Sequence, residues 1–193
     1  MLALSKRHDE IAEYIAAFFC GMAKATTDRD TNTDVQVVIL TSRDCPEIGI
    51  SSYSTLGLSD KNLVIDGRDF GFGVKVCGAI ITEQDKFLLI LADIGFNVVE
   101  EKWVAAHHTV FPNVVEPYFP DSEMKHVLLV SPFLWDEDFG DYSFADQRVV
   151  WLLAVPISEN EYRYALSVGA DCLEDMFAQK QINLFNIYRD SVL

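Results

Sequence analysis

Apolar residues recur every three or four positions over residues 6–25, so one side of this segment would be apolar in a helix. The recurring positions are Ile11, Tyr14, Ile15, Phe18 and Met22. Ser5 stands where a helix cap is expected, because its side chain can accept a hydrogen bond from the first turn. The polar run "TTDRDTNTD" at 26–34 has no such periodicity. We therefore expect a helix over 6–25 followed by a loop.

Three stretches in the first half of the chain have the composition or the alternation of β-strands. "VQVVIL" at 35–40 and "VKVCGAIIT" at 74–82 are rich in β-branched residues, which favour extended backbone. "GISSYSTLGLS" at 49–59 alternates less regularly, and Gly57 suits a bend within it. The intervening "DGRDFGFG" at 66–73 supplies the glycine and aspartate that turns prefer.

Helical spacing returns over residues 83–101 and again near the C-terminus. In "EQDKFLLILADIGFNVVEE" the regularly spaced apolar residues are Phe87, Leu88, Leu91, Ile94 and Val98. Residues 159–168 predict a second helix, which Gly169 can end, and residues 170–181 predict a third. In this last helix we expect Cys172, Leu173, Met176 and Phe177 to face the core.

Two apolar β-like runs, at 125–135 and 148–157, lie on either side of an acidic segment. Before them, "TVFPNVVEPYFPDSEM" at 109–124 holds three prolines and predicts an irregular loop across the surface. Strands and helices do not alternate strictly, which favours the α+β class with a mixed, mainly antiparallel sheet. No linker divides the sequence, so we expect one domain spanning residues 1–193.

The charge of the chain restricts its partners. Thirty acidic and fifteen basic residues give a formal net charge of −15. Such a surface repels nucleic acid and anionic membranes and attracts cationic proteins, although it also simply keeps a protein soluble.

The sequence shows neither an export signal nor the ~18 uninterrupted apolar residues of a membrane span. We expect a cytoplasmic protein with four reduced, buried cysteines: Cys20, Cys45, Cys77 and Cys172.

A Ser-Glu-Asn-Glu quartet follows the second apolar run and invites two interpretations. Ser158 beside Glu159 and Glu161 could begin an active site. The spacing Ser-x-x-Glu after a strand is also that of a capping box, in which each side chain bonds the backbone N–H of the other residue. The capping box explains every term of the pattern, so we predict the start of a helix.

The histidines carry no recognisable catalytic or metal-binding motif. His107 and His108 are adjacent, so on a strand they would point to opposite faces and could not hold one metal together. We expect His108 to be buried and hydrogen-bonded near Thr109; a catalytic His108 would need a buried carboxylate beside it in a deep pocket. Sequence patterns for phosphate, dinucleotide and zinc-protease sites are missing. The residues alone thus predict a protein that is not an enzyme and holds no cofactor or metal.

The acidic segment after residue 135 is the candidate partner-binding site. Its carboxylates could form a docking surface for a basic partner, with aromatic residues as anchors, because complementary charges speed and direct association. The alternative is a solvated loop. The candidate residues are Trp135, Asp136, Glu137, Asp138, Phe139 and Asp141.

Four segments resemble the Suppressor of fused family, in family order. They are "SSYSTLGLSD" at 51–60, "HHTVFPN" at 107–113, "LLVSPFLWDEDF" at 128–139 and "VVWLLAVPISENEYRYALSVGADCLEDMF" at 149–177. The ending with Arg189, Asp190 and Ser191 is also similar. SPFLW, then WL-x-x-x-PIS-x-x-E, then G-x-x-x-L-E is a specific series. The resemblance implies a mixed sheet surrounded by helices, without catalysis or cofactor.

The length of the chain resembles that of stand-alone bacterial members of the family. Animal Suppressor of fused has a second domain and grips a transcription-factor peptide between the two. The bacterial members resemble immunity proteins or antitoxins, which sit in the cytoplasm and neutralise a toxin, often a nuclease. The resemblance therefore implies a protein that covers a basic toxin with its acidic surface. A regulatory scaffold for an endogenous peptide is the alternative, and base rates alone allow a homodimer.

Overall fold

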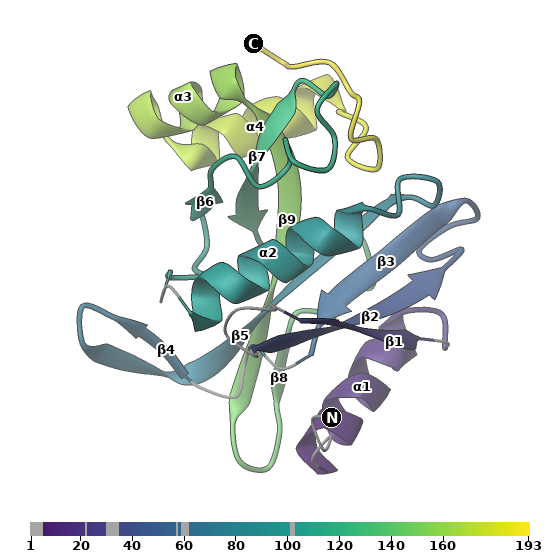
Figure 1. Ribbon diagram of the computed structural model, residues 1–193. Coiled ribbons are helices and arrows are strands. Elements are labelled where there is room, and N and C mark those ends of the chain that lie inside the picture. Colours follow the sequence, from purple (N-terminus) through teal and green to yellow (C-terminus); the bar gives the residue numbers. More distant parts are fainter. Residues whose placement is uncertain (1–5, 22, 30–34, 57, 59–61, 101–102) are drawn as a thin grey trace.

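One mixed sheet runs through the protein, and helices lie on both of its faces (Figure 1). The computed structural model describes residues 6–193 except 22, 30–34, 57, 59–61 and 101–102. In these residues the strands are β1 Lys24–Arg29, β2 Gln36–Arg43, β3 Ile50–Thr55, β4 Asn62–Ile65, β5 Arg68–Ile81, β6 Val110–Phe111, β7 Met124–Val130, β8 Asp141–Ser143 and β9 Arg148–Ser158. The helices are α1 Lys6–Phe18, α2 Phe87–Val99, α3 Glu159–Ser167 and α4 Ala170–Lys180.

The sheet has the order β1-β2-β3-β5-β9-β7-β6, with β4 paired to β5 and β8 to β9. β5 and β9 run parallel, and the other pairs are antiparallel. The long central strands β5 and β9 thus join the N-terminal strands to the C-terminal half of the chain. The predicted α+β class with a mixed, mainly antiparallel sheet is confirmed.

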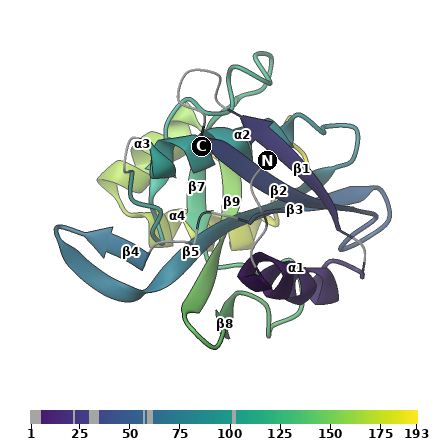
Figure 2. The ribbon, with the colours of Figure 1, turned by 60° about the horizontal axis from the view of Figure 1, so that its bottom comes forward.

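Alternation along the strands creates two separate cores. On β2, Val37 and Ile39 pack beneath α2, whereas Val38 and Leu40 face the opposite side, where α1 and α4 lie. Figure 2 shows α1 and α2 on opposite faces of the sheet. Because side chains of a strand alternate with period two, a buried strand between two layers needs apolar residues at every position. This need explains the unbroken run "VVIL" in the sequence.

The first helix is shorter than predicted, and a strand follows it. Cys20 and Gly21 have φ values of 54° and 82°, and the Gly21 N–H bonds the Ala16 carbonyl at 2.8 Å. This left-handed ending stops the helix, so the predicted continuation to residue 25 is wrong. Lys24–Arg29 form β1 at the sheet edge, where polar side chains are ordinary. The predicted positions of Ser5, Met22 and residues 30–34 lie outside the described residues.

The predicted turn region at 66–73 contains only a two-residue turn. Asp66 and Gly67 have φ values of 50° and 76°, as a tight hairpin between β4 and β5 requires. Residues 68–73 continue as strand β5. The bend expected at Gly57 lies outside the described residues.

The proline-rich segment at 109–124 is part of the core, contrary to the predicted surface loop. Phe111, Val115 and Phe119 are at most 5 % exposed and pack in the core beneath α2. Val110–Phe111 also pair with β7 as the short strand β6. The prolines limit regular structure here to the short strand β6, but they do not prevent burial.

The C-terminal helices follow the prediction closely. Ser158 caps α3 within a complete capping box with Glu161, which is confirmed. On α4, Leu173 and Phe177 are buried and Met176 is half-buried, but Cys172 is exposed. Cys20 is exposed as well, so the predicted burial holds for Cys45 and Cys77 alone. Among the described residues, the helices are too short or too polar to cross a membrane.

Candidate functional site

Aromatic residues hold the acidic segment against α1 and the sheet. The Phe139 side chain is 5 % exposed. The Trp135 ring stacks on Phe19 with centroids 5.0 Å apart, and its Nε1 donates a hydrogen bond to Ser52 Oγ at 2.9 Å. Trp135 is half-buried, so these two aromatic residues anchor the segment internally. Their side chains are turned toward the protein core, and the outward-facing part of the segment is acidic.

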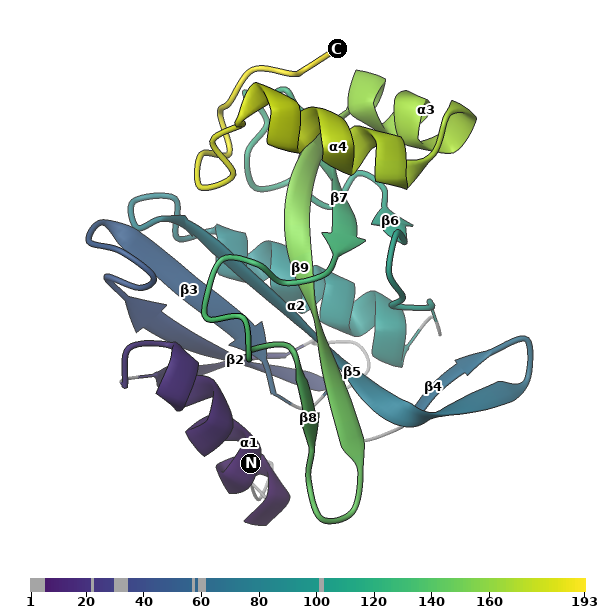
Figure 3. The same cartoon turned by 180° about the vertical axis from the view of Figure 1, so that it is seen from behind.

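We define the acidic face as the exposed carboxylates of the segment 136–146. Its members are Asp136, Glu137, Asp138, Asp141 and Asp146. Figure 3 shows β8, which belongs to this segment, beside α1. The sequence therefore predicted correctly that these carboxylates lie at the surface; that they bind a partner stays a prediction.

The carboxylates of the acidic face differ in the hydrogen bonds and ion pairs that they form within the protein. Asp136 Oδ1 accepts a hydrogen bond from the Asp138 N–H at 3.0 Å, which fixes the local turn. Arg148 donates from Nε to Asp141 Oδ1 at 2.8 Å, and this interaction lowers the pKa of the Asp141 carboxyl. Asp146 lies 3.7 Å from Arg7. The charges with the greatest freedom to meet a partner are thus those at 136–138.

Tyr14 joins α1 to the acidic segment. Its hydroxyl donates to the Asp138 carbonyl at 3.2 Å and accepts from the Gly140 N–H at 3.4 Å. Burial raises the pKa of this hydroxyl, and the nearby Asp141 and Asp138 carboxylates add to the rise, while the Gly140 hydrogen bond opposes it. The Tyr14 ring also packs 4.6 Å from that of Tyr142. These contacts attach the middle of the acidic segment to α1.

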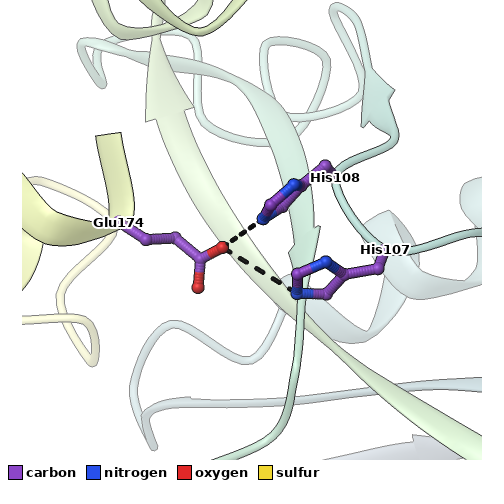
Figure 4. Close-up of side chains that lie close together, drawn as sticks. All are labelled: His107, His108 and Glu174. Carbon is purple, nitrogen blue, oxygen red and sulfur yellow. Dashed lines mark hydrogen bonds and ion pairs between the residues drawn. The ribbon is translucent and has the colours of Figure 1, made fainter. Parts of the chain in front are cut away.

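A second polar cluster lies near α4 and was not predicted. His107 and His108 occupy a turn after α2, and His108 has a φ of 67°. This left-handed conformation brings both rings to the same side, with centroids 3.8 Å apart (Figure 4). The expectation that the two histidines point to opposite faces is therefore wrong, because it assumed a strand. A left-handed non-glycine residue costs about 1–2 kcal/mol, which the surrounding contacts must offset.

Both rings converge on the carboxylate of Glu174 from α4. His108 Nε2 hydrogen-bonds Glu174 Oε1, and His107 Nε2 lies 3.8 Å from the same oxygen (Figure 4). Asp171, one turn earlier on α4, places Oδ1 3.7 Å from His108 Nε2. The predicted burial of His108 near Thr109 is thus only partial, since its side chain is 23 % exposed and bonds Glu174.

Glu174 also borders an apolar pocket of about 460 Å³ between α4 and the end of the sheet. The pocket is lined mainly by Val130, Phe133, Val155, Phe177 and Leu184.

Asp171 and Glu174 were not predicted from the sequence because they are more than sixty residues from the histidines. Their only local signal is the spacing of three that puts two acids on one side of a helix.

Two sequence comparisons agree on the kinship of the chain. The sequence model of the Suppressor of fused protein (SUFU) family matches residues 32–190. The Bacillus subtilis (strain 168) protein named "Immunity protein YqcF" is 34 % identical over 192 residues, which cover 100 % of both chains.

Solved structures share the fold at much lower sequence identity. A Suppressor of fused homologue from Neisseria gonorrhoeae FA 1090 superposes with a TM-score of 0.66 at 15 % identity, covering 97 % of each chain. A chain of the Sufu–Fu complex gives a TM-score of 0.70 at 12 % identity, over 96 % of this chain and 92 % of the other. Drosophila Suppressor of Fused gives 0.60 at 15 % identity; the match covers 80 % of this chain but only 42 % of that longer protein.

Proposed function

The chain belongs to the Suppressor of fused family, and from this premise we propose that it is an immunity protein that binds and neutralises a cognate protein toxin. The observation that carries the proposal is the full-length 34 % identity with a relative named as an immunity protein. Since the match extends over the whole of both chains, it covers every helix and strand described for this chain.

We propose further that the mechanism is stoichiometric and non-enzymatic. The acidic face would meet a basic surface of the toxin and cover its active site in the cytoplasm. A nuclease is the toxin class that fits this charge best, because nucleases use basic surfaces to hold phosphate. The formal net charge of −15 also favours attraction between this chain and a basic toxin.

Coexpression tests the proposed function. The protein encoded beside the gene of this chain would be expressed alone and together with it, while growth and complex formation are followed. We expect the neighbouring protein to stop growth, and this chain to restore growth by forming a one-to-one complex. A harmless neighbour, or a toxic one that this chain does not bind, would contradict the proposal.

A triple variant tests the acidic face separately. Asp136→Asn, Glu137→Gln and Asp138→Asn remove three charges, yet the amide oxygen introduced by Asp136→Asn can still accept the hydrogen bond that fixes the turn. We expect the affinity for the toxin to fall at least about tenfold, mainly through slower association at low salt. The matched control removes three exposed carboxylates elsewhere, at Glu47, Glu83 and Asp121. Equal affinities of the two triple variants would exclude the acidic face and leave the immunity function open.

The scaffold alternative draws on the apolar pocket beside α4. Phe133 is 59 % exposed at the pocket, and an apolar side chain of a peptide could enter there. If the neighbouring protein proved harmless, a pull-down from native lysate would compare wild type with Phe133→Ser. Loss of one specific endogenous protein in the variant would favour the scaffold.

A further inference from the structure

The pair of histidines at 107–108 is held in place by the backbone on both sides. The His108 N–H bonds the Leu129 carbonyl of β7 at 2.7 Å, and the Leu129 N–H bonds the Thr109 carbonyl at 2.9 Å. Thr109 also closes the turn, since its N–H bonds the Ala106 carbonyl at 3.0 Å. The two rings therefore project from a fixed turn beside the sheet, with their Nε2 atoms directed toward α4 (Figure 4).

The facing side of α4 presents two carboxylates one helical turn apart. Glu174 is half-buried, with 31 % of its side chain exposed, while Asp171 is 88 % exposed. In a helix, residues three apart lie on the same side, so both carboxylates can reach the histidines. Donor atoms of His107, His108 and Glu174 all lie within 4.8 Å of one another.

We propose that His107, His108 and Glu174 form a binding site for a divalent transition-metal ion, with Asp171 as a fourth ligand. Two imidazoles and carboxylates are a donor set that suits Zn²⁺, whereas Ca²⁺ and Mg²⁺ prefer oxygen alone. The proposal does not depend on toxin binding; β8, which carries Asp141 of the acidic face, lies beside α1 and apart from α4 (Figure 3).

Two of the donor separations are slightly longer than those of a tetrahedral zinc site. Ligand atoms 2.0–2.1 Å from a tetrahedral ion are about 3.3 Å apart. His107 Nε2 is 3.8 Å from Glu174 Oε1, and His108 Nε2 is 3.7 Å from Asp171 Oδ1. A bound ion would replace the hydrogen bond between His108 and Glu174, and the exposed Asp171 side chain would turn toward it to complete the ligand set.

A bound ion would connect three parts of the chain that are distant in sequence. It would join the turn after α2 to α4, and through the turn to β7. Metal binding to the folded state alone raises stability by mass action. Zinc would therefore act as a structural clamp that holds the C-terminal helices on the sheet.

Zinc titration of untagged, chelator-treated protein tests the site. We expect one Zn²⁺ per chain by calorimetry, and a visible absorption band of four-coordinate Co²⁺ when cobalt is added instead. At free Zn²⁺ about 100 times the dissociation constant, Tm should rise by roughly 5–10 °C.

Two single variants remove ligands with little disturbance. His108→Asn keeps a residue that tolerates the left-handed conformation, and Glu174→Gln changes only a partly exposed carboxylate. Each should weaken Zn²⁺ binding about 100-fold or more, since even partners outside the ligand shell cost about 10–100-fold.

The matched control is a variant of a different histidine–carboxylate pair, one that lacks the second histidine of the proposed site. His126 Nε2 lies 3.0 Å from Glu159 Oε2, and Glu159→Gln should leave zinc affinity unchanged. Absence of zinc binding, or binding that survives both His108→Asn and Glu174→Gln, would overturn the proposal. The cluster would then be an ordinary pairing of histidines with a carboxylate.

Discussion

At the scale of single residues, Glu161 connects the start of α3 to the end of the chain. Its carboxylate accepts hydrogen bonds from Arg189 at 2.7 and 2.8 Å, from the Ser158 N–H at 2.8 Å and from the Val192 N–H at 3.0 Å. Glu161 and Arg189 have side-chain exposures of 0 % and 6 %. A buried ion pair is costly to break, because the remaining charge keeps its desolvation penalty without its partner.

Replacing Glu161 with Gln should therefore destabilise the fold strongly. We expect a loss of about 3–5 kcal/mol in the free energy of unfolding, measured by urea denaturation. Arg163→Gln is the control: it breaks a surface ion pair with Glu159, whose loss should cost far less. Similar losses in the two variants would contradict the importance of burial.

The sequence predicted the capping box of Ser158 and Glu161 but not the ion pair of Glu161 with Arg189. The Ser-x-x-Glu spacing identified the capping box because a cap is a local interaction within four residues. Arg189 lies 28 residues beyond Glu161, and no local rule states that an arginine near the C-terminus returns to a helix start. His107, His108 and Glu174 escaped prediction for the same reason, since only tertiary packing and a left-handed turn bring them together.

Asp93 on α2 gives a prediction about pH. Burial raises the pKa of its carboxyl, and Asp28 adds to this effect, although a hydrogen bond from Tyr118 at 2.9 Å opposes it. A raised pKa in the folded state favours the protonated form. The corresponding stability is present below the unfolded pKa of about 3.9 and is lost as pH rises through the folded value.

We expect Asp93→Asn to gain stability relative to wild type as the pH rises from 4 to 7.5. The asparagine side chain keeps an oxygen that can accept the Tyr118 hydrogen bond but carries no charge to desolvate. Urea denaturation at both pH values measures the difference. A stability difference that does not change with pH would contradict the argument, whatever its sign.

At the scale of elements, α2 approaches the sheet closely because glycines stand at the contact. A Cβ added at Gly95 of α2 would lie 2.9 Å from both methyl carbons of Val37, and one at Gly78 of β5 would lie 2.6 Å from the Phe87 ring. Both distances are shorter than van der Waals contact permits. Either Val37 or the helix must move if a methyl group is inserted.

Gly95→Ala should thus destabilise the protein, although alanine favours helices by about 1 kcal/mol over glycine. Overpacking of a filled core costs about 1–3 kcal/mol, so we expect a net loss, measured by thermal or urea unfolding. Val99→Ala at the exposed end of the same helix should change stability by about 0.5 kcal/mol or less. A Gly95→Ala variant more stable than wild type would show that α2 can shift freely.

The elements that the sequence predicted well are those with an apolar period. The central strands and α2 were expected near their observed positions, since burial on two faces leaves a clear pattern. β1 was missed because an edge strand can be polar, as "KATTDR" is. The segment at 109–124 was misplaced because its prolines indicate irregular backbone but carry no information about burial.

At the scale of the whole molecule, the fold persists where sequence identity is low. TM-scores of 0.66 and 0.70 accompany identities of 15 % and 12 %, so the sheet and its helices tolerate extensive substitution. We propose that residues 1–193 form one domain, since all four described helices pack against one sheet or its ends. A binding surface, by contrast, must vary with its partner, and an exposed acidic segment anchored by buried aromatic residues allows such variation.

The most direct test of the proposed function is a titration of toxin activity. Purified chain would be added to a fixed amount of the cognate toxin, at a toxin concentration well above the dissociation constant. A stoichiometric immunity protein should reduce the activity linearly, reaching zero at one equivalent. Inactivation by far less than one equivalent would indicate catalysis, and activity that persists in excess of this chain would contradict the immunity function itself.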